Sequence, residues 1–401
     1  FFSMKNFFKF HLLALLLASF VIGCDSGDEP QLTGDNTVYE LKSKADPAIS
    51  GTVTFAKRAD NKTVITIKLN GTASGDSHPA HIHANTAAES GGIILDLTAV
   101  AGAGGESVTV VDKLNDGTAI TYEELIEIDG YVNVHKSASE LTTLIAQGDV
   151  GQNALTGDTK SYTLGSVSDP AISGTATFAK RKNNETLVTI QLTGTTSGGS
   201  HPAHIHANSA AQSGGIVIDL ASVDGATGKG VTNVAKLNAG TAITYDELLN
   251  YSGYINVHLS STNLTTLVAQ GDIGANELTG TKKVYTLNAV ANSGISGTAT
   301  FAERKSGFAL VTIQLTGTTA NGSHPSHIHG NNAATSGPIV KDLTTINGAT
   351  GKSVTHIAAL NDNTAITYAQ LLTYNGYINV HLSSTNLGTL VAQGNIGSNA
   401  P

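Results

Sequence analysis

The sequence contains a single cysteine, a single methionine and no tryptophan among its 401 residues. One cysteine rules out an intrachain disulfide, so packing and hydrogen bonds must hold the fold together. Charged residues make up 13% of the chain, aromatic residues make up 5%, and the apolar residues occur in short runs without a long helical stripe. This composition excludes a coiled coil and argues against a disordered chain. The net charge of −9 argues against a nucleic-acid partner.

The chain begins with the pattern of an export signal. Lys5 and Lys9 form a positive segment, residues 12–20 form a short apolar run, and Cys24 follows in the sequence Val-Ile-Gly-Cys. The apolar run is short for a helix that spans a membrane, and polar residues come directly after it. An ordinary signal peptide or a membrane anchor is the alternative interpretation.

The Val-Ile-Gly-Cys motif resembles the lipobox of bacterial lipoproteins, in which a peptidase cuts before the cysteine and the thiol carries a diacylglycerol. This resemblance implies a signal peptide at residues 1–23, lipidation of Cys24 and a tether at residues 24–35. We therefore expect a protein of the bacterial cell envelope that is attached to a membrane by its lipid. Exposure at the cell surface is compatible with this anchor.

A repeat of 123 residues governs the rest of the chain. Leu-Thr-Gly recurs at residues 32–34, 155–157 and 278–280, and no insertion or deletion is needed to align the three units. Because this period is too long for a solenoid and fits a whole domain, it predicts three tandem domains. We place them at residues 36–157, 158–280 and 281–401.

Each unit has the pattern of a β protein. Apolar residues alternate with polar ones over residues 49–55 and 65–69, which predicts strands with one buried face. Basic residues at 57–58, 181–182 and 304–305 lie between such strands and are expected in solvated hairpin turns. Thr-Tyr-Glu-Glu at 121–124 matches a helix capping box. We therefore predict an all-β chain of three antiparallel Greek-key β-sandwich domains, each with one short helix.

Twelve of the fourteen histidines lie in two motifs that recur with the repeat. The first motif is Ser-His-Pro-Ala-His-Ile-His, with Ser326 in place of alanine in the third copy, and the second is Tyr-Val/Ile-Asn-Val-His. These histidines are His78, His81, His83 and His135; His201, His204, His206 and His258; and His324, His327, His329 and His381.

Alternation along a strand places His81 and His83 on one face and Ile82 on the other. If the strand that ends at His135 is a neighbour, three imidazoles converge on the outer wall of the domain. Such a group can hold copper or zinc with an open coordination position, which predicts up to one metal ion per domain. His78 precedes a proline, so strand parity does not set its direction, and it is either a fourth ligand or a residue behind the ligands. Asp96, Asp219 and Asp342 are candidate carboxylate partners or residues of the solvated strand face.

The two histidine motifs, in this order and at this separation, resemble those of the CHRD domain, and the resemblance covers each unit nearly from end to end. It implies three tandem CHRD domains over residues 36–401. The chain departs from the family near the end of each unit, where residues 141–148 read Leu-Thr-Thr-Leu-Ile-Ala-Gln-Gly in place of a Gly-Glu-Ile-Arg-Gly-like strand.

A more distant similarity is to copper/zinc superoxide dismutase, in which a His-x-His strand and a later histidine bind copper. Here, no histidine lies between His83 and His135 to bridge two metals, and no arginine follows His135 within its unit. Three hypotheses remain: a lipid-anchored module that binds copper or zinc, a dismutase-like metalloenzyme, and a structural or adhesive array without metal. We favour the first, so that the chain is not expected to be an enzyme and its partners are a membrane and a metal ion. The sequence does not identify a protein or glycan partner.

Overall fold

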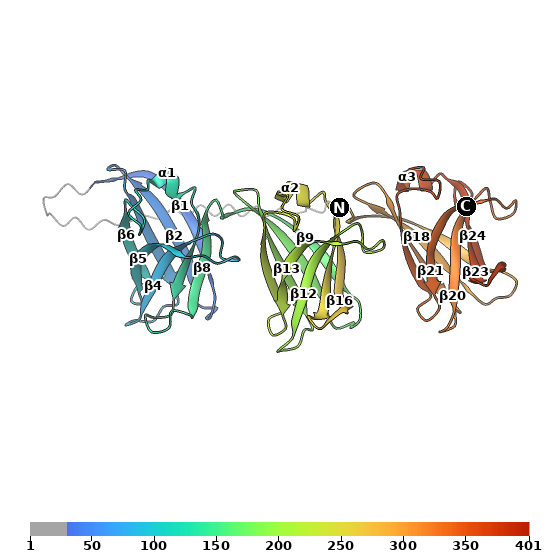
Figure 1. Ribbon diagram of the computed structural model, residues 1–401, viewed down its shortest axis with the longest axis horizontal. Coiled ribbons are helices and arrows are strands. Elements are labelled where there is room, and N and C mark those ends of the chain that lie inside the picture. The colour runs from blue at the N-terminus through green and yellow to red at the C-terminus, as the bar shows by residue number, and fades with distance from the viewer. Residues whose placement is uncertain (1–29, 401) are drawn as a thin grey trace, which may run out of the picture.

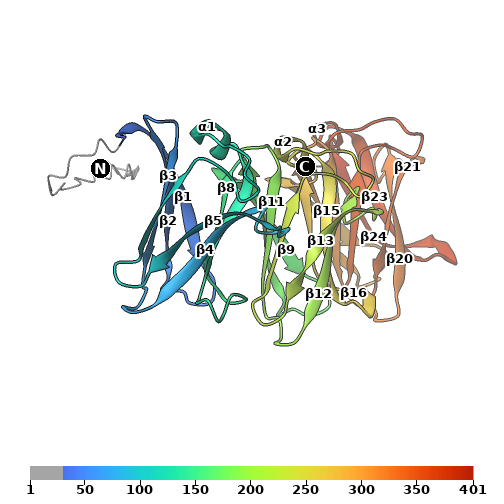
Figure 2. The same cartoon turned by 60° about the vertical axis from the view of Figure 1, so that its left-hand side comes forward.

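The computed structural model describes residues 30–400, and the strands in this range form three closed eight-stranded antiparallel barrels (Figure 1). The barrels stand in a row in chain order (Figure 2). Counted within each barrel, the strands follow the same order around the wall: 1-2-3-6-5-4-7-8. The all-β class with one short helix per unit agrees with the sequence prediction.

The first barrel consists of β1 (Leu32–Ser43), β2 (Ser50–Arg58), β3 (Thr63–Asn70), β4 (Ser77–Ala84), β5 (Ile93–Ala101), β6 (Glu106–Val111), α1 (Tyr122–Leu125), β7 (Asp129–His135) and β8 (Leu144–Gly151). The second consists of β9 (Leu155–Ser166), β10 (Ser173–Arg181), β11 (Thr186–Thr193), β12 (Ser200–Ala207), β13 (Ile216–Asp224), β14 (Lys229–Val234), α2 (Tyr245–Leu248), β15 (Ser252–Ser260) and β16 (Asn263–Gly274). The third consists of β17 (Leu278–Ala289), β18 (Ser296–Arg304), β19 (Ala309–Thr316), β20 (Ser323–Gly330), β21 (Ile339–Asn347), β22 (Lys352–Ile357), α3 (Tyr368–Leu371), β23 (Asn375–Ser383) and β24 (Asn386–Gly397). The predicted domain boundaries at residues 157 and 280 would cut through β9 and β17. Boundaries placed just before these two strands keep each strand whole.

Each barrel encloses its own apolar core. Val53 and Phe55 on β2 are fully buried, as the alternation in the sequence predicts, and Tyr39 meets the Phe55 ring edge-on at 5.3 Å between centroids. Gly51 takes the next inward position because a Cβ there would lie 1.8 Å from the Lys68 carbonyl oxygen on β3. The three cores share no residue.

The structure has closed barrels in place of the predicted two-sheet sandwiches. Two sparse seams connect the halves of each barrel. In the first barrel, β1 pairs with β8 only through Lys42–Gln147 and Ser43–Ala146, and β5 pairs with β6 only through Ala101–Glu106. Alternation reports that one strand face is buried, whether or not the sheet closes, so it does not distinguish the two architectures.

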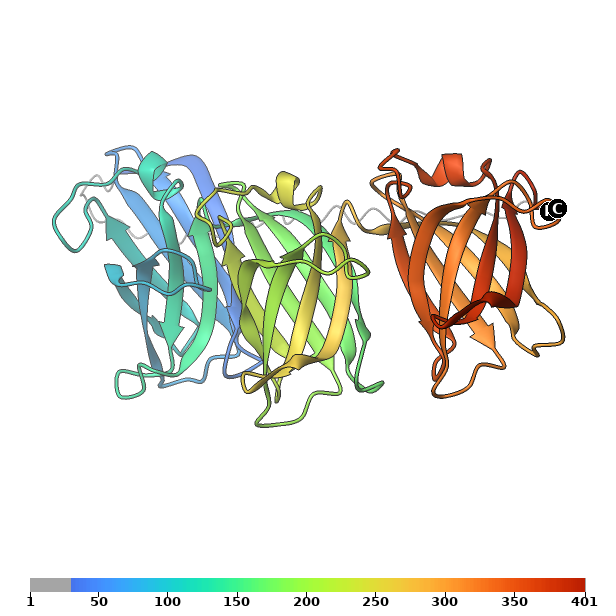
Figure 3. The same ribbon diagram turned by 45° about the vertical axis from the view of Figure 1, so that its right-hand side comes forward.

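The short helices form where the capping boxes predict them, and all three lie at the same end of their barrels (Figure 3). In α1, the Thr121 hydroxyl accepts a hydrogen bond from the Glu124 amide, and the Glu124 carboxylate accepts one from the Thr121 amide at 2.8 Å. Tyr122 is buried against the barrel. No helix within residues 30–400 is long and apolar enough to span a membrane.

A buried arginine connects each barrel to the one before it. Arg181, at the end of β10, is completely buried and donates from Nη1 to Oδ2 of Asp149 at 2.8 Å and to the carbonyl oxygen of Asn153. Arg304 makes the same contacts with Asp272 and Asn276. The prediction of a solvated turn is therefore wrong for both arginines, because the preceding barrel covers them.

Candidate metal centre

The structure places the two histidine motifs on neighbouring strands. β4 pairs with β7, so that Ile82 lies opposite Val132 and both side chains are fully buried in the core. His81 and His83 therefore point out of the barrel, and His135 emerges from β7 on the same side. The strand adjacency on which the predicted cluster depends is present in all three barrels.

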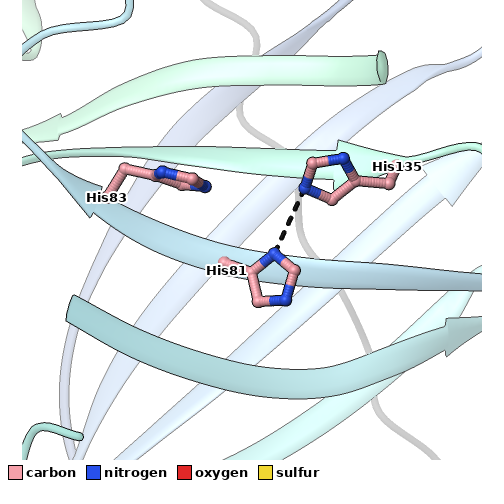
Figure 4. Close-up of side chains that lie close together, drawn as sticks. All are labelled: His81, His83 and His135. Atoms are coloured by element: carbon pink, nitrogen blue, oxygen red, sulfur yellow. Dashed lines mark hydrogen bonds between the residues drawn. The ribbon is translucent and has the colours of Figure 1, made fainter. Parts of the chain in front are cut away.

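Three imidazoles converge on the outer wall of each barrel. One ring nitrogen from each of His81, His83 and His135 lies within 4.8 Å of the other two, which is a spacing that can hold a metal ion (Figure 4). His81 Nδ1 and His135 Nε2 are 3.2 Å apart. The corresponding clusters are His204, His206 and His258 in the second barrel and His327, His329 and His381 in the third.

The loop after β4 fixes the orientation of His83. His83 Nδ1 lies 2.9 Å from the carbonyl oxygen of Gly91, which only accepts, so Nδ1 carries the proton of the neutral ring. The Tyr131 ring stacks on the imidazole at 5.0 Å, and its hydroxyl accepts a hydrogen bond from the Gly91 amide at 3.1 Å. The other ring nitrogen, His83 Nε2, consequently carries a lone pair, which is directed into the cluster.

The loop after β7 treats His135 in the same way. His135 Nδ1 donates to the carbonyl oxygen of Leu141 at 2.5 Å, and the equivalent His258 Nδ1 donates to Leu264 at 2.6 Å. Because the backbone carbonyl requires a donor, Nε2 of His135 also carries a lone pair. The protein thus sets the tautomer of two of the three rings before any ligand arrives.

His81 differs from the other two because its Nδ1 faces the cluster and its Nε2 faces outward. Nε2 lies 3.7 Å from Oδ1 of Asp96 on β5. The Asp96 carboxylate is 69% exposed and also accepts a hydrogen bond from the Asn115 side chain at 3.1 Å. Asp96 is therefore both a residue of the solvated strand face and a carboxylate next to the cluster.

Burial lowers the pKa of two of the three rings in the cluster. The pKa of His81 is lowered chiefly by desolvation and further by the neighbouring His135, while Asp96 opposes the shift. Desolvation also lowers the pKa of His135, against the hydrogen bond to Leu141. The corresponding rings of the second and third barrels shift in the same direction. Since only a neutral imidazole can bind a metal, these shifts favour the ligand form.

His78 lies outside the cluster. Its side chain is 3% exposed and follows the inward parity of Ala80 and Ile82, and its Nδ1 lies 2.8 Å from the carbonyl oxygen of Lys136. His201 and His324 are buried in the same way and lie 3.2 Å from the backbone oxygens of His258 and His381. The interpretation as a fourth ligand does not fit this geometry, because a register shift between His78 and Ala80 and inward parity turn the ring away from the cluster.

Two further side chains border the cluster, and the two histidine motifs do not predict a role for either. Asn133 on β7 points its amide nitrogen at His83 Nε2, at 3.4 Å, and Gln147 on β8 donates to Asn133 Oδ1 at 2.9 Å. Both recur at the 123-residue period, and this recurrence is the signal that could have identified them. Cys24, the predicted site of lipidation, lies outside the described residues.

The fold and the clusters define a chain of three tandem barrels, each with one group of three histidines on its outer wall. The model of the CHRD domain matches residues 30–140, 152–263 and 275–391, so the chain belongs to the CHRD domain family. The resemblance in the sequence motifs is thereby confirmed. Curated proteins and solved structures provide no significant match.

Proposed function

We propose that this protein is a lipid-anchored array of three metal-binding modules, each of which holds one copper or zinc ion. The observation that carries the proposal is the preset tautomer of His83 and His135. Backbone carbonyls take the Nδ1 protons of both rings, so the two Nε2 lone pairs point into a space that His81 Nδ1 also faces. Lone pairs that converge in this way favour a hydrogen-bond donor or a metal ion between the rings.

A proton fills this role in the absence of metal. His81 Nδ1 can donate it to His135 Nε2 across 3.2 Å. A metal ion would take the place of this proton, and the single proton of the neutral His81 ring would shift from Nδ1 to Nε2, beside Asp96 at 3.7 Å. Histidine ligands commonly direct their second nitrogen at a carboxylate or a backbone carbonyl, and all three rings do so here.

The donor set favours copper or zinc over calcium or magnesium. Three imidazole nitrogens suit borderline metals, whereas the harder cations prefer oxygen ligands. Three protein ligands also leave at least one coordination position open. His81, His83 and His135 would hold the ion in the first barrel, and the bound ion would supply Lewis acidity or one-electron chemistry according to its identity.

The envelope anchor is the second part of the proposal. It is supported by the lipobox-like sequence before Cys24, the positive residues at its start and the absence of any other cysteine in the chain. The three barrels would then stand outside a bacterial membrane, with the membrane and the metal as partners. The negative net charge argues against nucleic acid as a partner.

The experiment that tests metal binding compares the full chain with a variant in which His204 and His206 are both replaced by alanine. Both side chains project from the outer wall, while Ile205 between them keeps its core contact, so the barrel should remain folded. Calorimetric titration should show three metal ions per chain before the change and two after it. Equal uptake by both proteins would reject the cluster as the site. Turnover of superoxide by the copper-loaded chain would favour the dismutase-like alternative. If the chain takes up no metal even at saturating metal concentration, the structural array would be favoured.

A further inference from the structure

Asn133 holds a fixed position at the edge of the histidine cluster. It lies on β7 between Tyr131 and His135, and it is 7% exposed. Its side-chain amide nitrogen is 3.4 Å from Nε2 of His83, the nitrogen that carries a lone pair. This contact is a hydrogen bond, in which the Asn133 amide donates to the lone pair of His83 Nε2. Asn133 therefore need not be a metal ligand itself.

The direction of the Asn133 amide follows from its neighbours. The Gly91 carbonyl forces His83 Nδ1 to donate, which leaves His83 Nε2 as an acceptor and forces the amide nitrogen of Asn133 to face it. The Asn133 carbonyl oxygen then faces the other way and accepts from Gln147 at 2.9 Å. The donor end of Asn133 therefore points at the cluster, with its acceptor end already occupied.

The other two barrels repeat this arrangement. Asn256 lies 3.4 Å from His206 and accepts from Gln270 at 2.8 Å. Asn379 lies 3.5 Å from His329 and accepts from Gln393 at 2.7 Å. Two residues from different strands keep the same orientation in each unit.

We infer that Asn133, Asn256 and Asn379 select the external ligand of the metal, and that this ligand is a small anion or oxygen species that accepts a hydrogen bond. The inference rests on the proposed metal site. A metal ion takes the lone pair of His83 Nε2, so the amide N–H groups of Asn133 lose their acceptor while they remain nearly buried. An unpaired buried donor costs about 1–3 kcal/mol, and an acceptor at the neighbouring open position removes this cost. Hydroxide, azide and reduced dioxygen species are such acceptors, whereas a ligand that offers only donors is not.

The test uses the full chain loaded with Cu(II), with azide as the probe because its binding to copper is visible in the absorption spectrum. In one variant, Asn133, Asn256 and Asn379 are all replaced by alanine, which removes the donors. In the other, each is replaced by aspartate, which retains the acceptor for Gln147 and substitutes a carboxylate oxygen for the amide nitrogen. Copper stoichiometry is measured for every protein before azide is added.

We expect the alanine variant to bind three copper ions and to bind azide about tenfold more weakly than the parent, as for the loss of one hydrogen bond to a charged group. The aspartate variant should bind azide more weakly still. Equal azide affinity in the parent and in whichever variant folds, at equal copper content, would overturn the inference, as would the absence of azide binding to the copper-loaded parent. Failure of the parent to bind copper would instead reject the proposed function on which the inference rests.

Discussion

Arg181 of the second barrel and Asp149 of the first form an ion pair of 2.8 Å across the boundary between two domains, and the arginine side chain is completely buried. The Asp149 carboxylate has a second task, because its Oδ1 accepts a hydrogen bond from the Ala87 amide in the loop after β4. The same loop carries the Gly91 carbonyl that orients His83. The contact between barrels and the histidine cluster therefore share one loop.

The first prediction concerns this ion pair. Asp149→Asn should loosen the joint between the first two barrels, because it leaves the Arg181 charge buried without its carboxylate. Removal of one partner from a buried ion pair costs about 3–5 kcal/mol. Hydrogen exchange at residues 152–155 should accelerate, while the β2 amides of the first core remain protected.

The third barrel supplies a control for this experiment. Asn395 occupies the place of Asp149 and accepts from the Ala333 amide at 2.9 Å, but no arginine of a following barrel faces it within the described residues. Asn395→Asp should leave exchange at both joints unchanged. A joint that remains fully protected in the Asp149→Asn protein would show that backbone contacts alone hold the barrels together.

The second prediction concerns the joint between the second and third barrels. There, His356 occupies the position that Asn233 holds in the second barrel. Asn233 accepts from Nε of Arg181 at 2.7 Å, whereas Nε of Arg304 has no hydrogen-bond partner. Burial, together with the nearby charges of Arg304 and Lys341 and against the pull of Asp272, lowers the pKa of His356 to about 4. A histidine with a depressed pKa stabilises the folded chain fully above its unfolded value of about 6.5, and this contribution is lost as the pH falls toward the folded value.

Thermal melts of the parent and of His356→Asn between pH 7.5 and pH 4.5 test this sign. The parent should lose more stability than the variant as the pH falls, since the asparagine does not titrate and can accept from Arg304. All other ionisable groups are common to the two proteins, so their contributions cancel in the comparison. A difference between the two proteins that does not change with pH would contradict the prediction.

The third prediction concerns the tyrosine that supports the cluster. Phenylalanine at Tyr131, Tyr254 and Tyr377 retains the stacking on the imidazole but removes the hydroxyl that accepts from the glycine amide. Because the carbonyl of that glycine orients His83 and its equivalents, metal affinity should fall about tenfold, as is usual for residues behind the ligands. Competition with a chelator measures the change.

The capping-box tyrosines serve as the matched control. Tyr122 also has a hydrogen-bonded hydroxyl, 3.0 Å from the Thr37 side chain, but it is the first residue of α1 and is not part of the cluster. Phenylalanine at Tyr122, Tyr245 and Tyr368 should leave metal affinity unchanged. An equal loss of affinity in both triple variants would attribute the effect to general loosening of the barrels.

The fourth prediction concerns the anchor. Cys24→Ser removes the thiol that would carry the diacylglycerol, so the protein should no longer take up labelled fatty acid or be processed at residue 23. Each methylene group of an acyl chain that is buried in the membrane contributes about 0.8 kcal/mol to the binding free energy, and two or more chains give stable attachment. The serine variant lacks this contribution. Continued incorporation of label would exclude Cys24 as the lipidation site.

Period-two alternation in the sequence predicts which way the side chains of the cluster point. It placed His81 and His83 outward and Ile82 inward, and all three do so, because strand parity is a local property of the backbone. It did not establish that β4 and β7 are neighbours, since about 50 residues separate His83 from His135 and pairing between distant strands has no local signal.

Other features depend on contacts that no local pattern reports. The closure of each barrel rests on two sparse seams, and Arg181 is buried only because another barrel covers its hairpin. The orientation of Asn133 depends on Gln147 from the next strand. Each of these features becomes visible only when residues distant in the chain are placed side by side.

The central claim is that each barrel holds one metal ion through its three outward histidines, and metal content per chain tests it most directly. The protein from residue 30 onward, equilibrated with copper or zinc at pH 7.5 and freed of excess ion, should contain three ions by elemental analysis. Uptake should decline as the pH falls below about 6.5, at a midpoint displaced downward by the lowered pKa values of His81, His135 and their equivalents. The variant with alanine at His81, His83, His204, His206, His327 and His329 should contain none while it still melts cooperatively. Less than one ion per chain in the parent at saturating metal, or equal uptake by the variant, would contradict the account.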